Sequence, residues 1–109
     1  MNDARFPWLI LVPRRPAAIE LIDLDATDQR WLLDEIGLSC RALQAATPCD
    51  KLNVGALGNI VRQLHIHVVA RFADDPAWPG PVWGAGAAVA YDDEARDRLI
   101  GLIRAAFPR

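Results

Sequence analysis

The sequence has few of the residues that build special structures. Its two cysteines cannot form a disulfide framework. No apolar run approaches the roughly 20 residues that a membrane span needs, since the run Trp8–Val12 meets a proline and two arginines. A length of 109 residues suits one hydrophobic core and leaves no room for a second, so we expect a single domain over residues 1–109. An apolar content of 52% excludes intrinsic disorder.

Excess positive charge is also lacking. The chain has 12 basic and 14 acidic residues, and only Arg14 and Arg15 are adjacent basic residues. Nucleic-acid binding usually needs a basic stripe, so we expect no nucleic-acid partner. The first residues include an acid before any apolar run, which does not fit a secretory signal. We therefore expect a cytoplasmic protein without membrane association, with Cys40 as a buried thiol rather than bridged to Cys49.

The pattern of apolar residues predicts an α+β fold. The expected elements are, in order, a strand over Phe6–Val12, a helix capped by Thr27 that runs to Ala46, strands over Lys51–Leu57 and Gln63–Arg71, a loop over 74–86 and a helix capped by Asp92. This order predicts an antiparallel sheet, with one long helix after the first strand and a second helix at the C-terminus.

The strand at Gln63–Arg71 contains both histidines of the chain. Because side chains on a strand alternate between faces, Gln63, His65 and His67 share one face and Leu64 and Ile66 lie on the other. Three such polar groups are hard to satisfy in a core, so we expect function there. Three interpretations stay open: a nucleophilic imidazole, a pair of metal ligands, or a structural pair bonded to backbone and water. No carboxylate or cysteine is spaced to complete a metal site, so we expect no metal.

The segment Gln63–Val69 resembles the signature of the histidine triad (HIT) superfamily, His-φ-His-φ-His-φ-φ, where φ is apolar. Gln63 stands where the first histidine is usual. The other segments that resemble the family are Arg5–Arg15, the helix after Asp25, Lys51–Val54, Gly58-Asn59 and Trp78–Gly84. Together these segments cover most of residues 5–86, and they follow the order of the family's elements.

The resemblance implies a nucleotide hydrolase or transferase that needs no cofactor. In the family, the middle histidine attacks the α-phosphorus, and water then releases a nucleoside monophosphate from the covalent nucleotidyl-histidine. That role falls here on His65, and His67 would donate a hydrogen bond to a phosphate oxygen. Gln63 keeps a donor but cannot titrate, which weakens proton delivery to the leaving group. The implied substrates are purine compounds, either dinucleoside polyphosphates or nucleoside phosphoramidates.

The resemblance also indicates where the substrate binds. By position, Asn53, Gly58 and Asn59 would contact the ribose or the phosphates, and Arg71 could hold a phosphate. Each has a plainer interpretation: the asparagines as locally bonded structural residues, Gly58 as a turn residue, and Arg71 as a solvated strand end. The tryptophans of residues 74–86 either close over the site or anchor the core.

Two features of the chain bear on its partners. HIT proteins usually have two further strands before the segment that matches Phe6–Pro13, so this chain looks short at its N-terminus. An unpaired strand edge invites a second chain, and HIT proteins are commonly homodimers, so we expect a homodimer whose interface uses part of the apolar excess. Alternatively, Gln63 and the short N-terminus leave a nucleotide-binding module with little or no turnover.

Overall fold

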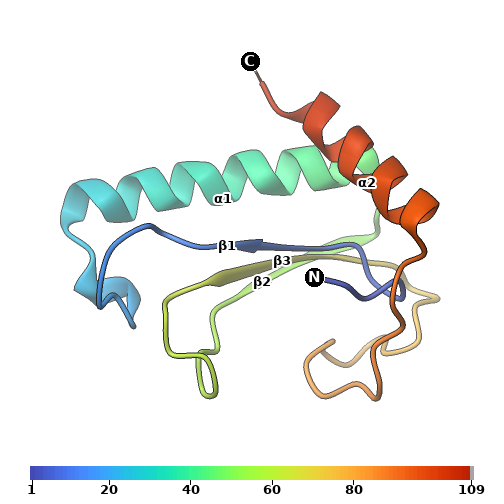
Figure 1. The fold of residues 1–109 in the computed structure, drawn as a ribbon, viewed down its shortest axis with the longest axis horizontal. Helices are drawn as coiled ribbons and strands as arrows, with labels where there is room; N and C mark the ends of the chain where they lie inside the picture. The colour runs from blue at the N-terminus through green and yellow to red at the C-terminus, as the bar shows by residue number, and fades with distance from the viewer. Residues whose placement is uncertain (109) are drawn as a thin grey trace.

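Three strands and two long helices form the framework of the protein. The computed structural model describes residues 1–108. Its elements are β1 (Trp8–Leu11), the short 3-10 helix η1 (Leu21–Asp23), α1 (Ala26–Ala46), β2 (Lys51–Gly55), β3 (Ile66–Arg71) and α2 (Asp93–Ala106). The α+β fold is confirmed, with the long helix after the first strand and the second helix near the C-terminus (Figure 1). Within residues 1–108, no helix is both long enough and apolar enough to cross a membrane.

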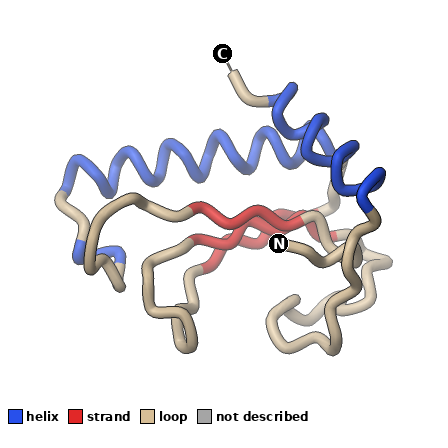
Figure 2. Tube along the Cα trace, in the orientation of Figure 1, coloured by secondary structure: helices blue, strands red, loops and turns tan. Residues whose placement is uncertain are grey.

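The sheet is antiparallel and has the order β1-β3-β2, so β3 is its central strand. Ile10 of β1 and Gly55 of β2 are the two neighbours of His67 across the sheet. Figure 2 shows both helices on one face of the three strands and long loops on the other. Because β3 is covered on both sides, each of its six residues is buried.

The two faces of β3 contribute to different parts of the core. On the helix face, Ile66 packs near Leu32 of α1, and Val68 packs with Leu43. On the loop face, Val69 packs in a separate cluster whose other buried members are Phe6, Trp8 and Val82. The histidines therefore lie on the face that the loops cover, as the alternation of apolar and polar residues predicts.

Some boundaries differ from those expected. β3 begins at Ile66 rather than Gln63, because the backbone N–H of Leu64 donates to Ala18 instead of joining the sheet. The first strand stops at Leu11, shortly before Pro13, which has no N–H to donate. β2 ends at Gly55 rather than Leu57. These shorter strands leave the motif's first positions in an irregular segment.

The N-terminal caps of the helices and the burial of Cys40 agree only in part with the predictions from sequence. Asp25, not Thr27, caps α1, because its carboxylate accepts from the backbone N–H of Asp28. Asp92 caps α2 as predicted. Both Cys40 and Cys49 are free and half-buried, so Cys40 is less enclosed than expected, although burial still raises the pKa of its thiol.

Candidate functional site

His65 lies immediately before β3 and is half-buried. Its Nδ1 is 2.7 Å from the backbone carbonyl oxygen of Gln63. A carbonyl oxygen can only accept a hydrogen bond, so Nδ1 is the nitrogen that donates. In the neutral ring the lone pair is therefore on Nε2, which is the form that a nucleophilic imidazole requires.

His67 lies within β3 and is 8% exposed. Its Nδ1 is 2.9 Å from Nε1 of Trp8, and an indole N–H can only donate. The neutral ring of His67 therefore has its proton on Nε2, the opposite arrangement to His65. Burial lowers the pKa of His67, and the nearby His65 and N-terminal amine lower it further. A lowered pKa keeps His67 neutral at pH 7.

Two tryptophans pack against His67 on the loop-covered face of the sheet. The ring centroids of Trp8 and Trp83 lie 5.5 and 5.4 Å from that of His67. Trp83 passes over Gly55 of β2, where an added Cβ would lie 3.2 Å from its ring. One of the expected loop tryptophans thus reaches the site. The other, Trp78, lies over the guanidinium of Arg71 instead.

Trp8 is the site residue that sequence reasoning missed. The sequence pattern places Trp8 only in an apolar strand, whereas its pairing with Val69 puts it on the histidine face. A diagonal neighbour on an antiparallel strand is within reach of an aromatic side chain. The signal that could have identified it is therefore the strand register, which single-sequence patterns do not supply.

Two hollows meet at His65. The first, of about 360 Å³, lies between η1 and the segment after β2, and Gly58 and Leu64 are among its lining residues. The second, of about 260 Å³, is lined by Ile10, Val12, Val61, Gln63 and His65. Because the edge of His65 borders both, a ligand in either hollow has access to its ring.

Gly58, Asn59 and Gln63 surround these hollows in different ways. Gly58 has a φ of +74°, a left-handed conformation that suits glycine. Asn59 follows it and is exposed. The amide nitrogen of Gln63 is 3.5 Å from the carbonyl oxygen of Pro13, the outer limit of a hydrogen bond. The side chain of Gln63 is exposed and only weakly held.

Arg71 and Asn53 occupy a separate cluster at the other end of β3. Arg71 is only 2% exposed, so the expectation of a solvated strand end is wrong. Its guanidinium donates to both carboxylate oxygens of Asp75, at 2.7 and 3.0 Å. It also donates to Oδ1 of Asn53 at 2.9 Å and to the carbonyl oxygen of Gly80 at 2.8 Å. Every nitrogen of the guanidinium is thus used inside the protein.

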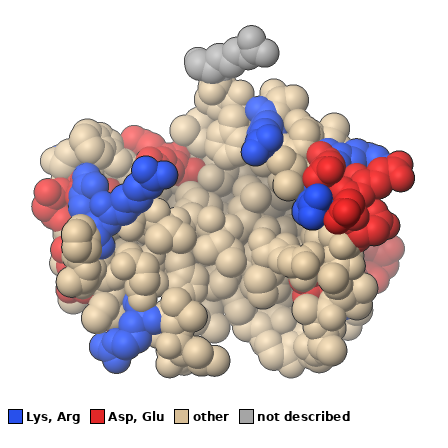
Figure 3. All heavy atoms as spheres, viewed as in Figure 1, with Lys and Arg blue, Asp and Glu red and all other residues tan. Residues whose placement is uncertain are grey.

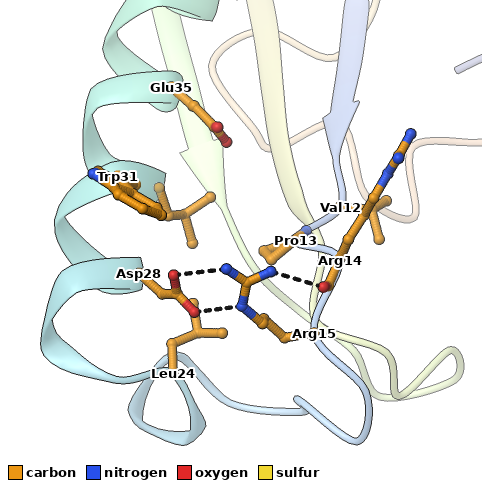
Figure 4. A pocket seen from close by; sticks show the side chains of 9 residues that line it. Val12, Pro13, Arg14, Arg15, Leu24, Asp28, Trp31 and Glu35 are labelled. Atoms are coloured by element: carbon orange, nitrogen blue, oxygen red, sulfur yellow. Dashed lines mark hydrogen bonds and ion pairs between the residues drawn. The ribbon is translucent and has the colours of Figure 1, made fainter.

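A third hollow, of about 290 Å³, lies between the end of β1 and α1, and neither histidine lines it (Figure 4). Arg15 donates to both oxygens of Asp28 there, at 2.5 and 2.9 Å. Trp31 and Glu35 of α1 also line it. The Arg14-Arg15 turn is exposed, but this ion pair ties it to the start of α1.

The distribution of charge and of potential metal ligands concerns two expected absences, a nucleic-acid partner and a metal ion. On the face seen in Figure 3, basic and acidic side chains are interspersed around an uncharged central area. Among residues 1–108, no three His, Cys, Asp or Glu side chains gather in a way that could hold a metal ion. The two histidines thus lie together without a third ligand of these types.

The chain is similar in sequence and structure to known histidine triad proteins. Residues 1–74 match the HIT domain family. A histidine triad protein from Sinorhizobium meliloti is 48% identical, with a TM-score of 0.96 over 98% of this chain and 79% of that one. One from Bradyrhizobium japonicum is 49% identical, with a TM-score of 0.96 over 99% and 81%. One from Marinobacter aquaeolei is 40% identical, with a TM-score of 0.94 over 98% and 78%.

These matches extend beyond the motif that suggested them. No curated protein is significantly similar to the chain. The structural similarities span nearly the whole chain, so they include α2, for which the sequence offered no family feature. Because the similarity covers only 79% and 81% of the first two relatives, those proteins are longer than this chain. By its match to the HIT domain and by its identity with these structures, the chain belongs to the histidine triad family.

Proposed function

We propose that the protein is a nucleotide hydrolase or transferase whose nucleophile is Nε2 of His65. The observation that carries this proposal is the 2.7 Å contact between Nδ1 of His65 and the carbonyl oxygen of Gln63. A backbone acceptor at Nδ1 fixes the ring orientation and leaves the Nε2 lone pair free to attack. HIT proteins typically act on nucleotides, which makes a phosphorus centre the target.

The reaction proceeds in two displacements at the α-phosphorus. Nε2 of His65 forms a bond to phosphorus while the bond to the leaving group breaks, giving a nucleotidyl-histidine. Water or another acceptor then attacks phosphorus, releases the histidine and takes the nucleotidyl group. Splitting one difficult substitution into two in this way is covalent catalysis. The substrates in this proposal are purine dinucleoside polyphosphates or nucleoside phosphoramidates.

The neighbouring residues take supporting roles in this reaction. His67, neutral and protonated on Nε2, donates to a non-bridging oxygen as negative charge grows there. The amide of Gln63 donates to the leaving group but supplies no titratable proton. Good leaving groups should therefore react faster than poor ones, and the preference should be stronger than in an enzyme with a general acid.

The hollows beside His65 provide the space for the nucleotide. Gly58 lines the hollow of about 360 Å³ together with His65, and Asn59 follows it at the surface. In the proposal, these two residues contact the phosphates or the ribose. In this proposal Asn53 and Arg71 are structural rather than substrate-binding residues, because they are hydrogen-bonded to each other inside the protein.

The test is incubation with diadenosine polyphosphates and with an adenosine phosphoramidate, with AMP as the measured product. His65→Ala should lower turnover by about a thousandfold or more, since it removes the nucleophile. Rapid acid quenching and mass analysis of wild type should find one nucleotidyl group on the peptide that contains His65. His67→Ala is the matched control, because it should slow the reaction yet still form that adduct.

Two results would count against the proposal. Undiminished AMP formation by His65→Ala would remove His65 as the nucleophile. Saturable AMP binding by wild type in calorimetry, with no product from either substrate class, would favour the nucleotide-binding module. The good-leaving-group preference is read from the same assays by comparing the two substrate classes.

A further inference from the structure

The hydrogen bond between Trp8 and His67 has no role in the reaction steps proposed above. Trp8 is 6% exposed and His67 is 8% exposed, so water does not readily replace either partner. The two side chains come from adjacent strands, with Trp8 opposite Val69 and His67 opposite Ile10. The 2.9 Å bond therefore joins two side chains that the sheet itself holds in place.

The chemistry of the two groups fixes the direction of this bond. An indole nitrogen has a proton and no available lone pair, so Trp8 must donate and Nδ1 of His67 must accept. The proton of neutral His67 is then confined to Nε2. If His67 became an imidazolium, its Nδ1–H would face the indole N–H, and two donors would oppose each other. Trp8 thus disfavours both the other tautomer and the charged form.

Trp83 shows what an aromatic neighbour does without this bond. Its ring lies at nearly the same distance from His67 as that of Trp8, 5.4 against 5.5 Å. Its Nε1 is buried and finds no hydrogen-bond partner among residues 1–108. Trp83 therefore shields His67 from water but does not determine which ring nitrogen of His67 carries the proton. The chain offers two tryptophans around one histidine, of which only one sets the tautomer.

We propose that Trp8 is a positioning residue, which holds His67 in the neutral tautomer that presents Nε2–H to the phosphate. The inference rests on the proposed function, because it assigns Trp8 a part in stabilising the transition state through His67. The other titratable groups near His67 are His65 and the N-terminal amine, whose nitrogen donates to the carbonyl oxygen of Trp8 at 3.0 Å. Neither of them is a hydrogen-bond partner of Nδ1, so the tautomer depends on Trp8.

Nuclear magnetic resonance tests this directly in unaltered protein. In a ¹⁵N-labelled sample, a coupling across the hydrogen bond should connect Nε1 of Trp8 with Nδ1 of His67. The ring nitrogens of His67 should show a pyrrole-like Nε2 and a pyridine-like Nδ1. Absence of the coupling, or a proton on Nδ1, would overturn the inference without any mutation.

Trp8→Phe then removes the donor and keeps an aromatic ring. Because the lost bond stabilised neutral His67, its pKa should rise by roughly half a unit to one unit, and its tautomers should mix. With either substrate class, kcat should fall about ten- to a hundredfold while KM changes little, as expected for an interaction that matters in the transition state.

Trp83→Phe is the matched control, because it trims a tryptophan on the same histidine without removing a hydrogen bond. The tautomer and pKa of His67 should stay at their wild-type values in this variant. Equal shifts in the two variants would show that packing alone sets the state of His67, which overturns the inference. Absence of turnover in wild type alongside an intact coupling would refute the proposed function alone, since the tautomer is measured without substrate.

Discussion

Two polar clusters share the loop-covered face of β3, the histidine pair at its start and Arg71 at its end. From sequence alone they look alike, because alternate positions of one strand place polar side chains on the face where a core would put apolar ones. In the structure they differ in one respect. Each guanidinium nitrogen of Arg71 donates to Asp75, Asn53 or Gly80, whereas Nε2 of His65 has no hydrogen-bond partner among residues 1–108.

This difference is the basis on which we propose a structural role for the Arg71 cluster and a reactive role for the histidine pair. The Arg71 guanidinium joins β2, β3 and the loop over 74–86 through internal bonds, so it stabilises the fold that surrounds the site. Each histidine is held through Nδ1 only, by the Gln63 carbonyl or by Trp8. In the proposed reaction, one ring nitrogen orients the ring and the other acts on the substrate. A polar group buried on a strand is thus a functional candidate only if part of it is left unbonded.

The largest expected effect comes from Arg71→Met. Removal of the guanidinium leaves the Asp75 carboxylate buried without its partner, and breaking a buried pair in this way costs about 3–5 kcal/mol. His65→Ala should instead lower the free energy of unfolding by less than about 1 kcal/mol while it removes turnover. Urea unfolding and AMP formation, measured on both variants, should thus give opposite patterns.

Arg71→Lys sharpens this result. Lysine keeps the charge but lacks the planar fork that bonds both oxygens of Asp75, so its stability should lie between wild type and Arg71→Met. A fully stable Arg71→Met variant with weakened substrate binding would reverse our comparison. It would restore Arg71 as a phosphate ligand.

An acid titration should give the next largest effect. Hydrogen bonds from Arg71 are the main cause that lowers the pKa of Asp75 from 3.8 to about 2. The folded state stabilises the ionised form of Asp75 more than the unfolded chain does. The resulting contribution to the free energy of unfolding is present above pH 3.8 and is lost as pH falls toward 2. The contribution is on the order of 2 kcal/mol.

The histidine end should respond in a different range of pH. The pKa of His67 is lowered from 6.5, so the unfolded chain takes up a proton more readily, and stability falls as pH drops below that value. Urea unfolding between pH 8 and pH 2 measures both regions. The difference between wild type and Asp75→Asn should shrink only below pH 4; a constant difference would contradict the assignment to Asp75.

The sequence predicted the fold and the shared face of the two histidines better than the partners of Arg71, and the reasons are physical. Alternation on β3 and helical spacing in α1 are local signals, and both elements were identified, although Asp25 rather than Thr27 caps the helix. The proposed roles of His65 and His67 rest on a motif that spans only a few residues. Local patterns of this kind can be recognised in a single sequence because they involve only residues that are close together in the chain.

The parts that could not be predicted depend on contacts between distant residues. Trp8 lies 59 positions from His67 in the chain, and Asn53 lies 18 from Arg71. Neither pairing can be inferred until the register of β1, β3 and β2 is known. The sequence therefore gives no sign that the hydrogen-bond partners of Arg71 lie in the next strand and the following loop.

Asn53→Ala is the variant with the smallest expected effect, and it decides how far the Arg71 cluster extends. Asn53 was a candidate for ribose contact, yet its Oδ1 accepts from Nη1 of Arg71 at 2.9 Å. Loss of this acceptor should lower the free energy of unfolding by about 1 kcal/mol. It should leave KM within about twofold, since β2 presents the amide to Arg71 rather than to the hollows at His65. A tenfold rise in KM at unchanged stability would instead make Asn53 a ribose ligand. Asn53 would then belong with the histidine site rather than with the Arg71 cluster.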